Sequence, residues 1–400
     1  MVIYQGYRER IQRIRKLMER YTLDVLILTD SRDVTYCTGH LQDGAPAWGG
    51  TAFVLPLEGE PALIIPEERY LSRFNMMNND VWSTWVKNFV PFIPKSQKNL
   101  MGQLIETCTK ILEEMRLNAS TIGLSLNSFL YDDYLTIKNA LSNVILKNST
   151  PLMDEVIQQP DDEELTLVKK AVEIADAGID AAIEVIDVSV PLSHVMAEVS
   201  RAMYEAGLWT VWATGGHGLG LCAVTGRDAI MSGGLTPERR IRRDDPVKLD
   251  LQAAYKFYGT CHMHELMIGV PSEDDRKIYD FMMNIISAAL IVATPGNKLS
   301  DIAKFCLEEF KKAGYDSRYS LRGFFGHSNG IELGSGGRRS MDITPDNNIE
   351  IKENMSLTFD ALIIRNNSLK EFEIPILVRG KGQKAEYMTK YPAGLLTLRK

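Results

Sequence analysis

The chain has few of the features that mark secreted, membrane-embedded or nucleic-acid-binding proteins. It has only five cysteines, and their scattered positions show no spacing typical of a disulfide framework or a zinc ribbon. No apolar run approaches the roughly 20 residues that a membrane helix requires, and charged residues come too early in the N-terminus for a signal peptide. The net charge of −7 would repel phosphate. These absences predict a soluble, cytoplasmic protein whose partner is neither a membrane nor a nucleic acid.

The composition that remains is that of an ordinary globular protein. Hydrophobic residues make up 45% of the chain and charged residues 24%, and there is no short-period repeat or low-complexity tract. A chain of 400 residues fits two domains, or one large and one small. Such a length can bury a hydrophobic core without disulfides or structural metals.

The first 158 residues alternate between helix and strand patterns. Apolar residues at helical spacing predict a first helix, and short β-branched runs bounded by turn residues predict strands. This alternation is typical of a three-layer α/β domain. The expected helices are 7–21 and 100–115, the expected strands are 24–29, 51–56, 61–66 and 121–124, and a turn is expected at 30–33.

A second domain is expected from residue 159 to residue 400. The composition turns acidic near Pro160, and Asp161 or Asp162 could cap a long helix whose apolar residues recur every three or four positions. Further helix and strand patterns predict an α+β domain. Helices are expected at 192–206, 275–293 and 300–313, with strands near 247–255 and towards the C-terminus.

Five residues in this second half can bind a metal, and each has a distinctive context. Asp250 and Cys261 stand eleven residues apart in strand-like segments. His327 lies in the sequence Gly-His-Ser-Asn-Gly, whose glycines allow a close approach of the backbone. Asp360 ends one strand-like run and Glu373 opens another.

The order of these motifs resembles that of the pita-bread superfamily, which includes methionine aminopeptidases, aminopeptidase P, prolidases and creatinase. Residues 33–39 also resemble its N-terminal signature Asn-Ile-Arg-Tyr-Leu-Thr-Gly. The resemblance implies a creatinase-like, ribonuclease H-like α/β domain at 1–158 and a pita-bread catalytic domain at 159–400. It also implies a homodimer. The loops around Trp48, Trp82 and Trp85 would then be lids across the dimer interface or, alternatively, part of the N-terminal core.

The resemblance also shows what this chain has changed. Metal-dependent members carry Asp, Asp, His, Glu and Glu at the five positions and hold two divalent ions, whereas this chain has Cys261 for the second Asp and Asp360 for the first Glu. A thiolate suits zinc but bridges magnesium or manganese poorly, and a free cysteine is often only a small buried hydrophobe. We therefore expect no metal or one divalent ion, with zinc, manganese and cobalt as candidates. The positions that would hold it are Asp250, Cys261, His327, Asp360 and Glu373.

The family's substrate-binding residues are also altered. Glu371 replaces an arginine that would neutralise a substrate carboxylate, and Cys222 and Gly334 align with two family histidines. His217, five residues before Cys222, could substitute for the first of these histidines. We take His217 and Cys222 as candidate substrate-binding residues.

A histidine pair departs furthest from the family pattern. His262 and His264 would point to the same face of a strand because their positions differ by two. The pair could pack at a surface or interface, or it could form a relocated metal or substrate site. On the second interpretation His264 joins the candidate substrate-binding residues.

The interpretation we favour is a creatinase-like hydrolase or lyase that splits a C–N or similar bond of a small molecule. His327 would be its general acid/base, partnered by Asp360 or Glu373, and it would use no metal or a single one. One alternative is a metal-dependent Xaa-Pro dipeptidase or aminopeptidase. The other is a non-catalytic pita-bread protein that uses the cavity for recognition. In the enzyme interpretations, the side chains of Asp250, His327, Asp360 and Glu373 should converge on one pocket.

Overall fold

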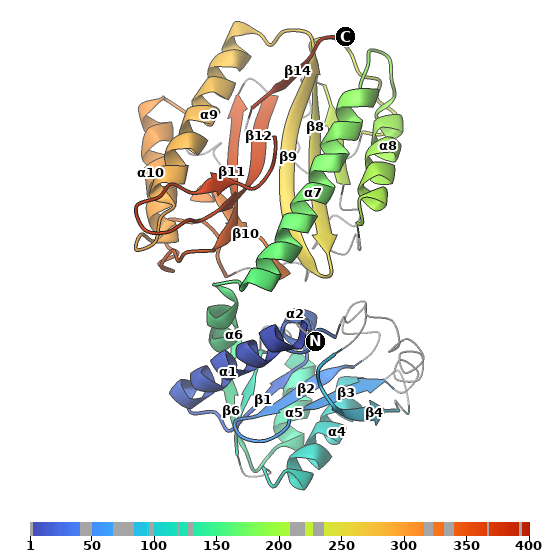
Figure 1. The fold of residues 1–400 in the computed structure, drawn as a ribbon, viewed down its shortest axis with the longest axis vertical. Coiled ribbons are helices and arrows are strands. Elements are labelled where there is room, and N and C mark those ends of the chain that lie inside the picture. Colours follow the sequence, from blue (N-terminus) through green and yellow to red (C-terminus); the bar gives the residue numbers. More distant parts are fainter. Residues whose placement is uncertain are drawn as a thin grey trace. The chain divides into compact units, whose positions relative to one another are not determined.

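The chain folds into two compact units, residues 1–157 and 158–400 (Figure 1). No helix in the described part of the chain is long and apolar enough to cross a bilayer. The computed structural model describes residues 3–40, 50–66, 84–93, 95, 100–117, 120–126, 131–208, 221–226, 236–315, 323–331, 340–365, 368–391 and 394–400.

The first unit is an α/β domain, as predicted. Its described strands form a sheet in the order β4-β3-β2-β1-β5-β6, in which β2 alone runs antiparallel to its neighbours. Helices α4 and α5 pack on this sheet through a buried aliphatic cluster that includes Leu104, Ile111 and Ile137. The helices are α1 (Ile3–Tyr21), α2 (Ser31–Thr38), α4 (Leu100–Glu114), α5 (Tyr131–Ala140) and α6 (Thr150–Ile157); the strands are β1 (Val25–Leu28), β2 (Ala52–Pro56), β3 (Ala62–Pro66), β4 (Asn88–Phe92), β5 (Thr121–Leu124) and β6 (Ile145–Asn148).

The turn expected at residues 30–33 is instead the start of helix α2. The Asp30 carboxylate accepts a hydrogen bond of 3.0 Å from the backbone N–H of Arg32, which caps the helix. The buried Arg32 guanidinium pairs with Asp33 at 2.7 Å and with Asp154 at 3.2 Å. The prediction was wrong because a capping residue and a turn residue have the same local sequence signature.

One of the three tryptophans proposed as lids lies in the described part of the chain. The Trp85 side chain is half-buried, and its indole N–H donates a hydrogen bond of 2.8 Å to the carbonyl of Cys37. This contact ties Trp85 to helix α2 of its own unit, and its role as a lid stays a prediction. Trp48 and Trp82 lie outside the described residues.

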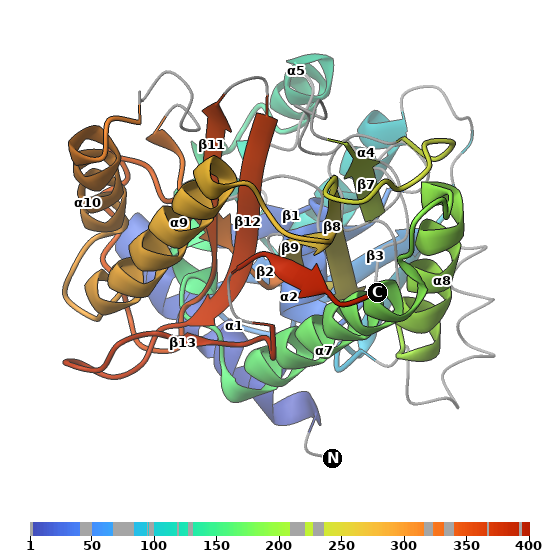
Figure 2. The same ribbon diagram turned by 90° about the horizontal axis from the view of Figure 1, so that it is seen from above.

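The second unit is built on a sheet in the order β10-β11-β12-β9-β8-β7, with β13 and β14 added beside β12 and β9. Figure 2 shows α7 and α8 near β8, and α9 and α10 near β11. Helix α7 begins where the sequence predicted, because Asp161 and Glu164 form a reciprocal capping box. The helices are α7 (Asp162–Val185), α8 (Leu192–Glu205), α9 (Glu273–Val292) and α10 (Leu299–Lys312); the strands are β7 (Leu221–Thr225), β8 (Pro246–Tyr255), β9 (Tyr258–Ile268), β10 (Gly326–Ser328), β11 (Ser356–Arg365), β12 (Ser368–Leu377), β13 (Glu386–Tyr387) and β14 (Leu396–Leu398).

Strand alternation divides this sheet into an apolar face and a polar one. Leu249 and Leu251 of β8 pack with α7 and α8 in one hydrophobic cluster, whereas Phe359 of β11 and Phe372 of β12 pack with α9 and α10 in another. Because successive side chains of a strand point to opposite faces, the residues between them point away from the helices. The acidic residues of β8, β11 and β12 lie at these positions.

Candidate functional site

Backbone pairing brings three of the predicted site residues into adjacent positions on the sheet. Asp250 of β8 pairs with Met263 of β9, Met263 pairs with Glu373 of β12, and Glu373 pairs with Asp360 of β11. Paired residues of antiparallel strands point to the same face. Cys261 is two residues from Met263 and therefore shares that face. One row across four strands thus gathers the expected carboxylates.

The Cys261 side chain lies among these carboxylates. Its thiol donates a hydrogen bond to the Glu373 carboxylate, and its Sγ atom is 3.6 Å from Oδ1 of Asp250. Burial raises the pKa of this thiol well above its ordinary value, and the negative charges of Glu373 and Asp250 raise it further. The thiol therefore keeps its proton until a cation enters, which argues against Cys261 as a nucleophile.

His327 reaches the same cluster from strand β10. This strand pairs His327 with Thr358 of β11, and Gly326 has a φ of +130° at a point where a Cβ atom would lie 2.0 Å from the Thr358 carbonyl oxygen. Only glycine fits there. Nδ1 of the imidazole lies 2.9 Å from the Ser328 carbonyl, which can only accept a hydrogen bond. Nδ1 therefore carries a proton, and Nε2 is the nitrogen that can act as a base or a metal ligand.

A carboxylate that was not expected in the site completes the cluster. Glu371 is 2% exposed and contributes an oxygen that lies within 4.8 Å of carboxylate oxygens of Asp360 and Glu373. Its pKa is raised well above the ordinary value by burial and then by the charges of Glu373 and Asp250. The signal was present in the sequence, because residues two apart on a strand share a face. From the sequence we interpreted Glu371 only as the replacement of a family arginine.

Two overlapping sets of three side chains could hold a metal ion. One set is Cys261, His327 and Glu373, and the other is Asp360, Glu371 and Glu373; within each set the ligand atoms lie within 4.8 Å of one another. Thiolate, imidazole and carboxylate together form a donor set that zinc accepts. The residues of the first set thus fit a divalent ion such as zinc, with Asp250 beside the sulfur ligand.

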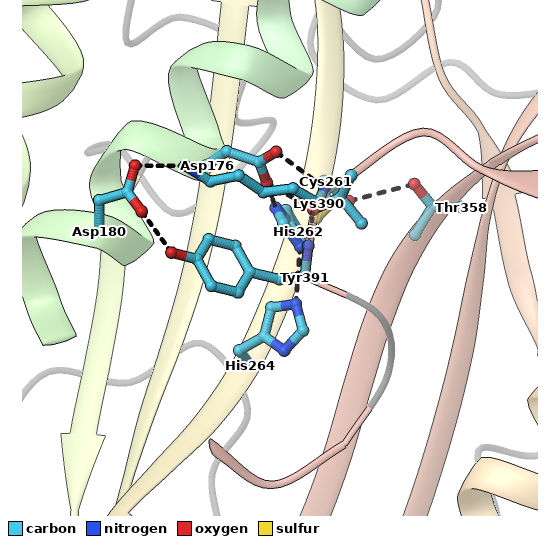
Figure 3. Close-up of polar contacts among 9 residues, drawn as sticks. Asp176, Asp180, Cys261, His262, His264, Thr358, Lys390 and Tyr391 are labelled. Atoms are coloured by element: carbon cyan, nitrogen blue, oxygen red, sulfur yellow. Dashed lines mark hydrogen bonds and ion pairs between the residues drawn. The ribbon is translucent and has the colours of Figure 1, made fainter. Parts of the chain in front are cut away.

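The histidine pair occupies the opposite face of β9. His262 and His264 are both fully buried, so the expected surface or interface packing is wrong; this face of the strand is covered by helix α7. Their Nε2 atoms are 2.7 Å apart, and Nδ1 of His262 lies 3.4 Å from Oδ1 of Asp176 on α7 (Figure 3). The ring of His264 also lies against Tyr391. His264 is thus placed in packing behind the site, on the other side of the strand from Cys261.

The C-terminal segment holds this buried pair against helix α7. Thr389 and the backbone N–H of Lys390 donate hydrogen bonds to the Asp176 carboxylate, while the Lys390 ammonium and the Tyr391 hydroxyl reach Asp180 (Figure 3). Burial lowers the pKa of His262 well below its ordinary value, and it lowers the pKa of His264 to about 4. Both rings are therefore neutral at physiological pH.

Two further predicted positions fall wholly outside the described residues, and a third is described in part. His217 and Gly334 are not described, and for Cys222 only the backbone is described. That backbone pairs with Asp250 at the edge of the row described above. The role of His217 and Cys222 as substrate-binding residues therefore stays a prediction.

Comparison with known families agrees with this architecture. The family described as "Metallopeptidase family M24" matches residues 166–379, and "Creatinase/Prolidase N-terminal domain" matches residues 10–156. The X-Pro aminopeptidase of Thermotoga maritima has the same fold, with a TM-score of 0.79, 17% identity, and coverage of 97% of this chain and 99% of that one. The Pyrococcus horikoshii prolidase gives a TM-score of 0.77 with 20% identity, covering 96% and 98%.

Curated relatives have the names of peptidases and hydrolases. The Xaa-Pro dipeptidase of Pyrococcus furiosus is 24% identical over 378 residues, which cover 94% of this chain and 97% of that protein. The ectoine hydrolase of Halomonas elongata is 22% identical over 371 residues, covering 89% and 88%. The chain therefore belongs to metallopeptidase family M24, a family of hydrolases, and carries the N-terminal domain of creatinases and prolidases.

Proposed function

We propose that this protein is a hydrolase that splits a C–N or similar bond of a small molecule at the cluster around Glu373, with no more than one divalent ion. The observation that carries this proposal is the convergence of a thiol, an imidazole and carboxylates from four strands of one sheet, with Glu373 as the common member of both candidate ligand sets. Family membership supports hydrolysis as the reaction type. The altered ligands support a departure from the two-metal peptidases.

The Nε2 atom of His327 would be the reactive nitrogen whether or not a metal takes part. Its Nδ1–H is fixed by the Ser328 carbonyl, so Nε2 presents a lone pair to the cluster. Without a metal, Nε2 would accept the proton of the attacking water, and Glu373 would stabilise the imidazolium that results. When bound, a divalent ion would supply a more acidic water. Cys261, His327 and Glu373 would then hold the ion, and Asp360 or Glu371 would be the proton acceptor.

The metal content of the purified protein tests this part of the proposal. Elemental analysis of protein prepared without added metal should show at most one zinc-class ion per chain. The Cys261→Ser variant should lower the affinity for zinc by roughly tenfold or more, because it removes the sulfur ligand. Cys306→Ser, which changes a buried cysteine of α10, is the matched control and should keep the metal. Two ions about 3.5 Å apart, bridged by carboxylates, would contradict the proposal.

A metal-dependent Xaa-Pro dipeptidase is the second candidate, favoured by the Pyrococcus furiosus relative, whose match extends over nearly the whole of both chains. Two features of this site weigh against it. Glu371 places a carboxylate where a substrate carboxylate would need a cation, and Cys261 replaces an oxygen ligand with sulfur. A dipeptide would therefore meet repulsion at its C-terminal carboxylate.

We expect this chain to turn over Xaa-Pro dipeptides poorly with manganese, cobalt or zinc. The specificity constant should stay below roughly 10⁴ M⁻¹s⁻¹, which lies at the low end of efficient enzymes. The measurement is proline release from a panel of Xaa-Pro dipeptides at each metal, with a known prolidase assayed in parallel as a positive control. Efficient turnover of any member of the panel would favour the dipeptidase instead.

A further inference from the structure

We propose that Glu371 determines substrate specificity: together with Asp360 it forms a subsite that receives a positively charged nitrogen group of the substrate, such as an ammonium or amidinium. This inference rests on the proposed function and adds a substrate class to it. It concerns a residue that lies outside the five family ligand positions.

The first argument is the placement of the Glu371 carboxylate. It shares a strand face with Glu373, and their oxygens and that of Asp360 lie within 4.8 Å of one another. Glu371 is 2% exposed, and its Oε2 atom has no hydrogen-bond partner among the described residues. A buried carboxylate oxygen without a donor costs free energy unless a ligand supplies one. A ligand that carries N–H donors would supply this missing hydrogen bond.

The second argument is the balance of charge around this oxygen. The carboxylates of Glu373, Asp250 and Glu265 all act on Glu371, and the opposing cation is Lys248. The Lys248 ammonium donates one hydrogen bond to the Leu369 carbonyl, and its single positive charge is shared between Glu265 and Glu371. Carboxylates thus outnumber cations at this point of the site.

A single divalent ion does not remove the excess of negative charge near Glu371. An ion bound to Cys261, His327 and Glu373 would be offset by the thiolate and by the Glu373 carboxylate. The carboxyl groups of Asp360 and Glu371 would then lie beside the ion without a cation of their own. One of them keeps a proton unless a second positive group enters, and a substrate nitrogen with several N–H donors can bond both carboxylates at once.

A second buried lysine, Lys370 of strand β12, does not balance the negative charge at Glu371. Lys370 points to the opposite face of the strand from Glu371 because the two are adjacent in sequence. Its ammonium pairs with Asp275 of α9 at 3.3 Å and lies 5.5 Å from the ring centre of Tyr279. Its charge is therefore committed to the helix side of the sheet.

Three probes of matched shape test the proposal on the full-length protein. Benzamidine carries a cation, benzamide is its neutral counterpart, and benzoate carries an anion. The wild-type protein should bind benzamidine about tenfold or more tightly than benzamide, since a hydrogen bond to a charged group is worth that much. Benzoate should bind more weakly than either. Equilibrium titration gives each Kd without requiring turnover.

Two variants then assign the preference to Glu371. Glu371→Gln keeps the size of the side chain and should weaken benzamidine by about tenfold while leaving benzamide unchanged. Glu371→Arg should reverse the order, so that benzoate binds more tightly than benzamidine. Glu353→Gln, at an exposed glutamate of the same unit, is the matched control and should bind all three probes as the wild type does.

Several results would overturn the proposal. One is equal binding of benzamidine and benzamide by the wild-type protein, a test that needs no variant to fold. Another is an unchanged benzamidine Kd in Glu371→Gln, as expected if Glu371 only shares a proton with Asp360 or Glu373. A third comes from titration with Mn²⁺ alone: a second ion that binds the wild type but not Glu371→Gln, and that displaces benzamidine, would make the ligand a metal.

Different results would refute the role of Glu371 and the proposed function. Cation selectivity without hydrolysis of any C–N substrate would refute the proposed function alone. Hydrolysis that is indifferent to the charge of the substrate and to Glu371 would refute the specificity role alone.

Discussion

His327→Ala should lower kcat by roughly 10²- to 10⁴-fold, the usual contribution of a positioned acid/base group. The imidazole is 3% exposed, and its Nδ1 is held by the Ser328 carbonyl, so the variant loses the Nε2 lone pair within the cluster. The free energy of unfolding should change by no more than about 1 kcal/mol, because the imidazole lies among the polar groups of the cluster and not in a hydrophobic core. The measurements are kcat on the substrate that the wild type hydrolyses and denaturant unfolding of the same preparation.

The control for this variant is His194→Ala. His194 is exposed on helix α8, so its removal should leave both turnover and stability as they are in the wild type. Retained turnover in His327→Ala, together with a loss of 1–3 kcal/mol in stability, would give His327 a structural role instead. That outcome would also remove the basis of the proposed function.

Acidification should destabilise the second unit through the buried histidine pair. Burial lowers the pKa of His264 to about 4 in the folded protein, against about 6.5 in the unfolded chain. As the pH falls below 6.5, His264 binds a proton in the unfolded chain but not in the folded protein. Stability is therefore lost between pH 6.5 and about 4, and this contribution levels off below that. Between pH 7.5 and 4.5 the loss from His264 should be about 2.5 kcal/mol.

The His264→Phe variant isolates this contribution. Phenylalanine keeps a ring against Phe372 and Tyr391 but has no titrating nitrogen, so the fall in stability between the two pH values should shrink by about 2.5 kcal/mol. At pH 7.5 the variant should be less stable, because Nε2 of His262 loses its partner. Urea unfolding at both pH values gives the numbers, with His194→Phe as the exposed control. An unchanged pH dependence in His264→Phe would show that His264 has the same pKa in the folded and unfolded protein.

Local patterns were sufficient for most elements of the fold. Asp161 was one of the two expected caps of α7, and the structure shows the capping box with Glu164. The strand-like contexts of Asp250, Asp360 and Glu373 are strands β8, β11 and β12. These features follow from neighbours a few residues apart, which the sequence displays directly. The turn predicted at Asp30 was wrong because the same local sequence fits both a turn and a helix cap.

The site required contacts between residues that are far apart in the chain. Cys261 and Glu373 are 112 residues apart in sequence, and their hydrogen bond depends on the pairing of β9 with β12. The sequence placed both residues in a family pattern, but it did not show that Glu371 would join them as a buried carboxylate. Likewise, it placed His262 and His264 on one strand face, and only the packing of α7 decided that this face is buried.

The sequence by itself thus determined the two-domain fold class and which residues alternate on each strand, because hydrophobic periodicity is a local property. The tertiary structure decided the charge of the site. A carboxylate is ordinary on a solvated strand, but beside three other acidic groups and shielded from water it must bind a cation or keep its proton. That environment is created by strand pairing and by burial, and neither can be read from the residues adjacent to Glu371.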